Sequence, residues 1–80
     1  MEPTDYIPID CGLYSEYELA IMHRNRLRLS WRDPDSNVHI GIVTPTDLHT
    51  RKGAEYMIVT GQDGETFAIR LDRIMHCSSV

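Results

Sequence analysis

The sequence has 80 residues, of which 41% are hydrophobic and 25% are charged, and its formal net charge is −4. This length suits one domain with a modest core and leaves little room for a deep, walled active site. The composition is that of an ordinary soluble domain, and no apolar run approaches the roughly 20 residues that a transmembrane helix needs.

The first ten residues, MEPTDYIPID, lack the positive start and apolar core of a signal peptide. We therefore expect a cytoplasmic protein. Cys11 and Cys77 are then expected to be free thiols, with a single disulfide between them as the alternative. No C-x-x-C or H-x-x-x-H spacing occurs, so no metal site is predicted.

Charge is distributed unevenly near the N-terminus. Residues 1–20 contain five acids and no Lys or Arg, whereas residues 21–32 contain four Arg and no acid. An acidic chain lacks the concentrated positive charge on which nucleic-acid binding depends. It is compatible with docking onto a basic surface, because opposite charges steer association.

The first predicted element is a helix at about 15–23. Ser15 and Glu18 are spaced as a capping box, and Glu16 and Glu18 would lie in the first turn, where negative charge complements the helix dipole. An apolar stripe follows at helical spacing, formed by Tyr17, Ala20 and Ile21. Two turns are too few to be stable alone, so this helix must pack on another element.

Strands follow. Residues 26–32 alternate between apolar and polar and predict a half-buried strand. Residues 38–44 predict a second strand that ends at Pro45, before a polar loop over 46–53. Residues 54–60 are apolar on both faces and predict the most buried strand. After a hairpin turn at 61–64, residues 65–71 and 72–77 predict two short strands, or one strand bent near Leu71.

One short helix and four or five closely spaced strands, without a crossover helix, predict an α+β, mainly β fold. At this size an antiparallel meander buries its strands best as a small curled barrel. We expect one domain over residues 1–80, with residues 1–5 and 78–80 flexible.

Candidate catalytic residues are isolated from one another. His76 and Cys77 are adjacent on a predicted strand, so they point to opposite faces and cannot act as a base and its nucleophile. The other histidines are scattered, most carboxylates lie in turns, and no glycine-rich phosphate loop occurs. The sequence therefore predicts no enzyme, no catalytic residue and no cofactor.

Two basic features remain open to interpretation. Arg26, Arg28 and Arg32 share one face of the first predicted strand, where they form either a solvated face or a phosphate track for single-stranded RNA. Trp31 alternates to the opposite face, which favours a place in the core. The pair Arg51 and Lys52 gains meaning only if its loop lies beside the acidic helix.

Three sequence blocks together resemble a known family. Y-x-P-I-[DN]-C-x-x-Y-x-x-x-E-L-A is matched over residues 6–20, D-L-x-x-R-K-x-x-E-Y over 47–56, and R-L-D-[KR]-I over 70–74. The blocks occur in the right order and cover roughly residues 6–75. The chain is similar to the bacterial Rho-binding antiterminator family, Rof.

The resemblance implies an Sm-like fold, in which a short N-terminal helix packs on a small, strongly bent five-stranded antiparallel barrel. It also implies a monomer that binds the N-terminal RNA-binding domain of the transcription termination factor Rho. Binding would block RNA from Rho's primary site and cause antitermination, with no direct nucleic-acid contact by this chain. The alternative is an Sm-like single-stranded RNA-binding module that uses Arg26, Arg28 and Arg32.

The resemblance also implies the residues that contact Rho. These are Asp10, Tyr14, Glu16, Glu18, Arg51 and Lys52. Tyr6 and Pro8 would fix the approach to the helix, Ile9 and Leu19 are expected in the core, and Arg70 with Asp72 is expected to form a structural ion pair. The chain departs from the family at Gly12 and Leu13, where acidic residues are common, so the acidic surface is expected to be weaker or shifted.

Overall fold

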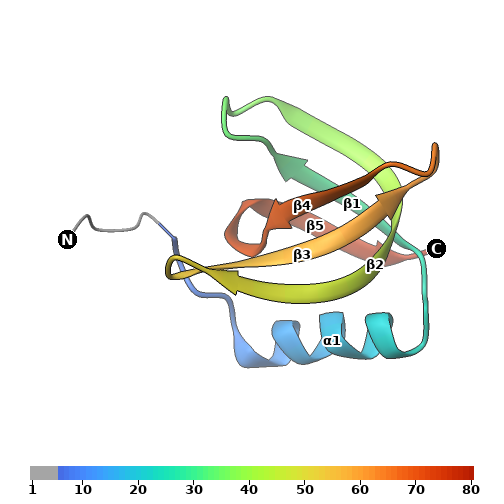
Figure 1. Cartoon of the computed structure of the whole chain (residues 1–80), viewed down its shortest axis with the longest axis horizontal. Helices are drawn as coiled ribbons and strands as arrows, with labels where there is room; N and C mark the ends of the chain where they lie inside the picture. The colour runs from blue at the N-terminus through green and yellow to red at the C-terminus, as the bar shows by residue number, and fades with distance from the viewer. Residues whose placement is uncertain (1–5) are drawn as a thin grey trace.

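The computed structural model describes residues 6–80, which form one α-helix and five strands (Figure 1). In chain order these are α1 (Cys11–Met22), β1 (Leu27–Arg32), β2 (Val38–Arg51), β3 (Ala54–Gly61), β4 (Thr66–Arg70), the 3-10 turn η1 (Leu71–Arg73) and β5 (Ile74–Ser79). Every pair of neighbouring strands is antiparallel, in the order β4-β3-β2-β1-β5. The predicted α+β, mainly β class is confirmed.

The sheet bends strongly around its interior and stays open (Figure 1). Strands β4 and β5 follow each other in the chain across η1, yet they stand at opposite ends of the strand order. The described strands therefore curl as a barrel does without closing into one. This arrangement is compatible with the Sm-like fold.

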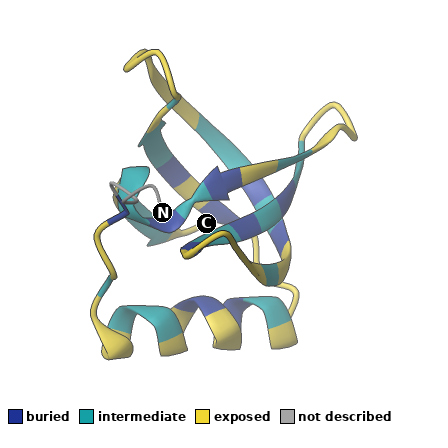
Figure 2. Ribbon diagram, turned by 60° about the vertical axis from the view of Figure 1, so that its left-hand side comes forward, coloured by how far each residue is buried: buried dark blue, intermediate teal, exposed yellow. Residues whose placement is uncertain are grey.

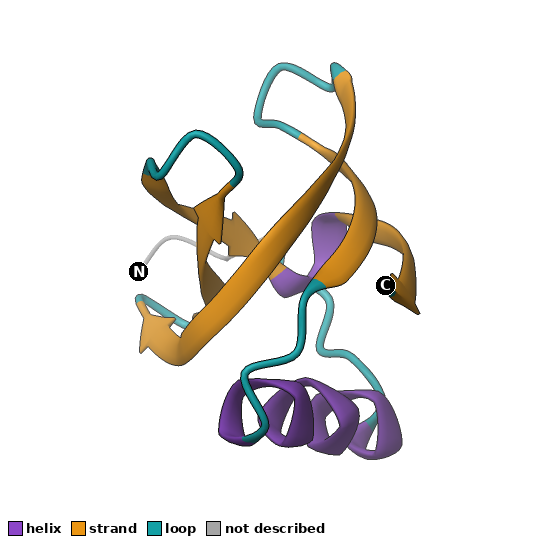
Figure 3. Cartoon of the chain, turned by 90° about the vertical axis from the view of Figure 1, so that its right-hand side faces the viewer, coloured by secondary structure: helices purple, strands orange, loops and turns teal. Residues whose placement is uncertain are grey.

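One cluster of buried side chains joins the helix to the sheet. Helix α1 lies beneath the curled sheet, to whose strand β1 one loop connects it (Figure 3), and buried residues gather inside the curl and on the helix side that faces it (Figure 2). Tyr17 of α1 is only 2% exposed, and Leu29 of β1 and Met57 of β3 are fully buried. No helix among residues 6–80 is long and apolar enough to cross a bilayer.

The helix begins earlier than predicted. Asp10, rather than Ser15, is the N-cap, and its Oδ2 accepts hydrogen bonds from the amides of Gly12 at 3.0 Å and Leu13 at 3.3 Å. The predicted capping box is therefore wrong, and no acidic residue lies in the first turn. The earlier start has a physical reason, because it lets Leu13 and Tyr14 pack beside the buried core.

Strand β2 continues through the proline that was predicted to end it. Pro45 is buried and pairs with Val59, and the register with β3 shifts between Pro45 and Asp47. This bulge accommodates a residue without an amide donor and bends the strand. The predicted loop over 46–53 is accordingly wrong, since the strand runs to Arg51.

The turns are short. Lys52 and Gly53 have φ angles of 50° and 81°, as a two-residue type I′ hairpin between β2 and β3 requires. The predicted hairpin over 61–64 is confirmed, with the Gly64 amide donating to the Gly61 carbonyl at 3.0 Å. At the C-terminus, where flexibility was expected, Ser78 and Ser79 pair with β1. Residues 1–5, also expected to be flexible, lie outside the described residues.

Candidate partner-binding surface

Side chains of the C-terminal half hold the segment that leads into α1. The Arg70 guanidinium binds the Asp72 carboxylate through two hydrogen bonds, of 2.6 Å from Nε to Oδ1 and 3.0 Å from Nη2 to Oδ2. Asp72 Oδ2 also accepts the Ile7 amide at 3.1 Å, and the Tyr6 hydroxyl donates to Glu55 Oε1 at 3.0 Å. The predicted structural ion pair is confirmed, and it fixes the path of residues 6–10.

The predicted acidic contacts on α1 are exposed, but they do not share one side of the helix. Asp10, Glu16 and Glu18 are all exposed. Glu16 and Glu18 are two residues apart, which separates them by about 200° around the helix axis. Glu16 acts electrostatically on Tyr17 and Cys77, so it lies on the side of α1 toward β5.

Glu18 lies on the other side, with Tyr14. Burial raises the pKa of the half-buried Tyr14, and the negative charges of Glu55, Glu18 and Asp47 raise it further. These four residues, from α1, β2 and β3, are called the Tyr14 cluster below. Asp47 and Glu55 were not predicted as contacts, although the sequence block over 47–56 contained both. Tyr14 therefore lies within the electrostatic reach of carboxylates from three elements.

Asp47 is held in its charged form by local contacts. The Leu48 amide donates to Asp47 Oδ1 at 2.8 Å, and His49 Nε2 lies 2.9 Å from Asp47 Oδ2. The amide first and His49 second lower the pKa of Asp47. Exposed carboxylates that keep their charge suit recognition by a cationic partner.

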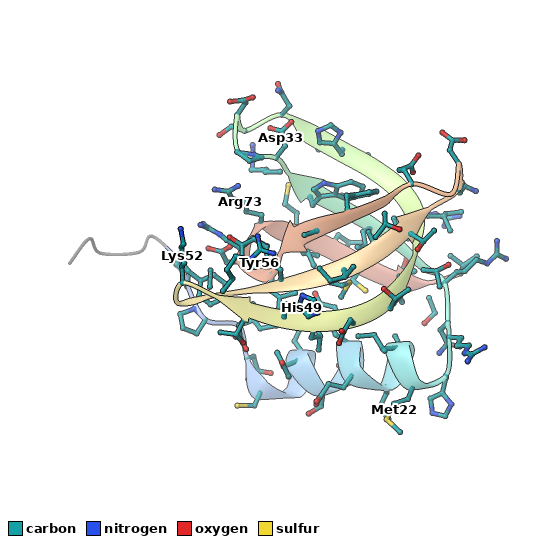
Figure 4. All side chains as sticks on the ribbon, in the orientation of Figure 1. Met22, Asp33, His49, Lys52, Tyr56 and Arg73 are labelled. Carbon is teal, nitrogen blue, oxygen red and sulfur yellow. The ribbon has the colours of Figure 1, made fainter. Side chains whose placement is uncertain are left out.

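The predicted basic pair lies at the tip of the β2–β3 hairpin. Figure 1 shows this tip beside the chain that descends into α1, in agreement with the hydrogen bond from Tyr6 to Glu55. Lys52 is exposed at the tip (Figure 4). Arg51 lies over the Tyr56 ring, 5.9 Å from its centroid. Since Tyr56 and Glu55 point to opposite faces of β3, Arg51 is turned away from the face that carries Glu55.

The arginine row of the alternative reading is also exposed. Arg28 is exposed on the outward face of β1, Arg32 is exposed at the end of that strand, and Arg26 precedes it. Trp31 is half-buried and packs against the core, as predicted. Its partners were not predicted: its ring stacks with His39 at 5.6 Å between centroids and lies 5.9 Å from the Phe67 ring.

Two further sequence expectations concern single side chains. Ile9 packs against the core as expected, whereas Leu19 is 51% exposed, so its predicted core position is wrong. Leu19 lies on the helix side opposite to Tyr17 and Ala20, which face the sheet. Cys11 and Cys77 are free thiols, and no group of three or more His, Cys, Asp or Glu within residues 6–80 could hold a metal ion.

Comparison with known proteins places this geometry in a family. No protein-family model matches the chain. A solved structure of the proteasome accessory factor B/C (PafBC) of Arthrobacter aurescens matches 94% of the chain and 12% of that protein, with a TM-score of 0.76 at 18% identity, which supports the fold alone. Protein rof of Escherichia coli (strain K12) and Protein rof of Shigella flexneri are each 38% identical to it over 69 residues, covering 86% of this chain and 76% of theirs. The chain therefore belongs to the Rof family.

Proposed function

We propose that this chain inhibits Rho by binding its N-terminal RNA-binding domain and blocking RNA from the primary site, which causes antitermination. Membership of the Rof family supports the choice of partner. The observation that carries the mechanism is the exposure of Asp10, Glu16 and Glu18 on a helix that is packed on the sheet.

An RNA-binding groove attracts the phosphates of RNA, and it attracts fixed carboxylates for the same electrostatic reason. The chain has no Lys or Arg before Arg24, so no Lys or Arg side chain in its first 23 residues repels such a groove. The helix is already formed and capped by Asp10, so little conformational entropy is lost when it docks. Tyr14, half-buried beside three carboxylates, offers a ring that can replace a stacked base.

The hairpin tip would complete the contact. Lys52 stands at the hairpin tip (Figure 4), where it can pair with an acidic residue at the rim of the groove. Arg51 would need to leave the Tyr56 ring in order to reach the same partner surface. We therefore expect Lys52 to contribute more than Arg51. In this proposal the protein acts as a cytoplasmic monomer that competes with RNA sterically and electrostatically, without catalysis or a cofactor.

The test is a titration of this protein into Rho loaded with labelled cytosine-rich RNA. We expect displacement of the RNA, and a loss of at least about tenfold in potency when Glu16→Lys and Glu18→Lys are combined. Asp35→Lys is the matched control, because Asp35 is exposed in the β1–β2 turn, remote from α1 in Figure 1. If the folded protein fails to displace RNA at any accessible concentration, the proposal is refuted.

The single variants add a finer reading. The Tyr14 cluster concentrates carboxylates on the Glu18 side, so Glu18→Lys should reduce potency more than Glu16→Lys. The alternative RNA-binding module predicts a different pattern. It would bind single-stranded RNA in the absence of Rho. Arg28→Glu would abolish that binding, whereas Glu16→Lys and Glu18→Lys would leave it unchanged.

A further inference from the structure

A second surface feature lies away from the acidic helix. A cleft of about 460 Å³ opens between the β1–β2 turn and strand β4, and Arg73 of η1 also lines it. This volume is within the range of about 300–1,000 Å³ that is typical of small-molecule sites. Figure 4 shows Arg73 between Asp33, on the β1–β2 turn, and Tyr56 of β3. The competition proposed above makes no use of this cleft.

Aromatic side chains form one wall of the cleft. The Trp31 ring is nearly parallel to His39, with an interplanar angle of 18°, and is tilted by 32° from Phe67. Tyr56 also lines the cleft. Trp31, Tyr56 and Phe67 are all half-buried and all line the cleft. Such a row offers flat surfaces on which a planar base can stack.

The charge of the cleft is positive. Arg32, Arg70 and Arg73 line it together with a single acid, Asp33. That carboxylate is already engaged, since Oδ1 accepts the amides of Asp35 and Asn37 at 2.9 Å each and Oδ2 lies 2.8 Å from His39 Nε2.

The three arginines differ in what they already bind. Arg70 is paired with Asp72, and Arg32 donates to the Ser36 carbonyl at 3.5 Å. Arg73, by contrast, makes no hydrogen bond or ion pair within the part of the chain that the structure describes. A guanidinium in a half-buried position without a protein partner can bind an anion at little cost to the fold.

We propose that this cleft binds a nucleoside phosphate, with its base on the wall of Trp31 and Phe67 and its phosphate on Arg73. The ligand is either a free nucleotide or one nucleotide of a single-stranded RNA, since both present the same base and phosphate. The observations that carry the proposal are the stacked rings, the engaged acid and the available guanidinium in one cleft. It is independent of the binding of Rho by α1.

Trp31 supplies the probe, because it is the only tryptophan of the chain. Its fluorescence, excited at the red edge of its absorption, is followed while nucleoside monophosphates are added, and amide shifts in NMR spectra locate the change. The matched ligands are the nucleosides without phosphate, inorganic phosphate alone and a short unstructured RNA. We expect saturable quenching by the nucleotide, with binding at least about tenfold weaker for both the nucleoside and inorganic phosphate.

Matched variants identify the phosphate contact. Arg73→Gln removes the charge and keeps a polar side chain, and should weaken nucleotide binding about tenfold or more. Arg28→Gln makes the same change on the outward face of β1 and should have no effect. Thermal unfolding of both variants, expected to match the parent, shows that the fold is kept. A free nucleotide as ligand predicts equal affinity for mononucleotide and RNA, whereas RNA as ligand predicts tighter binding of the oligomer.

Three results would overturn the proposal. The first is the absence of saturable change at Trp31 or at cleft amides at millimolar nucleotide. The second is equal binding of nucleoside and nucleotide, which would leave Arg73 without a role. The third is RNA binding that Arg28→Gln weakens and Arg73→Gln does not, which would assign RNA to the outward face of β1.

Discussion

The replacement of Asp72 by Asn tests the anchor that positions the acidic helix. The Asp72 carboxylate is 8% exposed, and it accepts two hydrogen bonds from Arg70, whose side chain is 12% exposed, and a third from the Ile7 amide. Removing one partner of a buried ion pair costs about 3–5 kcal/mol, and Arg70 keeps its contact with the Tyr6 ring in the variant, which favours the lower end of this range. Asn keeps one acceptor oxygen and nearly the same shape, so we expect about 3 kcal/mol.

This loss is large for a chain of 80 residues, whose total stability is about 4–12 kcal/mol. With a slope of about 1 kcal/mol per molar urea, the midpoint of unfolding should fall by about 3 M. Asp63→Asn is the matched control, since Asp63 is exposed and Asn-Gly suits a hairpin turn as well as Asp-Gly. Its midpoint should change little.

A second measurement isolates the anchor itself. Ile7 is 71% exposed, so only its hydrogen bond to Asp72 protects its amide from exchange with solvent. Asp72→Asn should therefore speed hydrogen exchange at Ile7 more than in the core of β3. A loss of less than 1 kcal/mol, with the Ile7 amide still protected, would show that the ion pair does not hold this segment.

Three further predictions concern single side chains. Lys52→Asn should stabilise the hairpin by up to about 1 kcal/mol in thermal unfolding, since Asn tolerates the positive φ of 50°, yet weaken competition with RNA; a variant of unchanged potency would exclude Lys52 from the interface. Burial raises the pKa of Tyr17 to about 12, so its contribution to stability is complete below about pH 10 and is lost as pH rises through 12. Tyr17→Phe should not lose this stability, so its pH-dependent loss should be smaller than that of the parent by about 2–3 kcal/mol at the highest pH. Identical losses of stability in variant and parent between about pH 10 and pH 12 would contradict this. The hydrogen bond of His39 lowers the pKa of Asp33 to about 2, so Asp33 stabilises the fold above about pH 4 and loses this effect as pH falls through 2; His39→Ala should raise that pKa in an NMR titration, and no change would remove His39 as its cause.

Local patterns predicted the elements whose side chains alternate or stack regularly. Leu27 and Leu29 alternate with polar residues, and the strand they predict is β1, with both leucines buried. Asp63 and Gly64 mark a turn that needs no distant partner. Pro45 shows where this reasoning fails: locally it ends a strand, but pairing with Val59 on β3 and a bulge carry β2 past it. Such long-range pairing is not visible in a window of a few residues.

The candidate site was predicted in its residue types rather than in its arrangement. The sequence placed Glu16 and Glu18 together because both would lie in the first turn of a helix capped by Ser15, and the structure separates them around α1. It missed Asp47 and Glu55, since only the curl of β2 and β3 brings them to Tyr14. An acidic surface that is assembled from three elements follows from tertiary structure, and sequence spacing alone does not reveal it.

Strands β2 and β3 each carry residues of both proposed surfaces. Glu55 points toward Tyr6 and the Tyr14 cluster, whereas its neighbour Tyr56 points to the opposite face and lines the cleft. A partner on α1 would therefore leave the cleft accessible, and energetic effects at the two surfaces should add. If Glu18→Lys changed nucleotide affinity, or if nucleotide changed competition for Rho, the coupling would have to pass through β2 or β3, because these strands contribute to both surfaces. In that case nucleotide would change the affinity for Rho by the same factor as Rho changes the affinity for nucleotide.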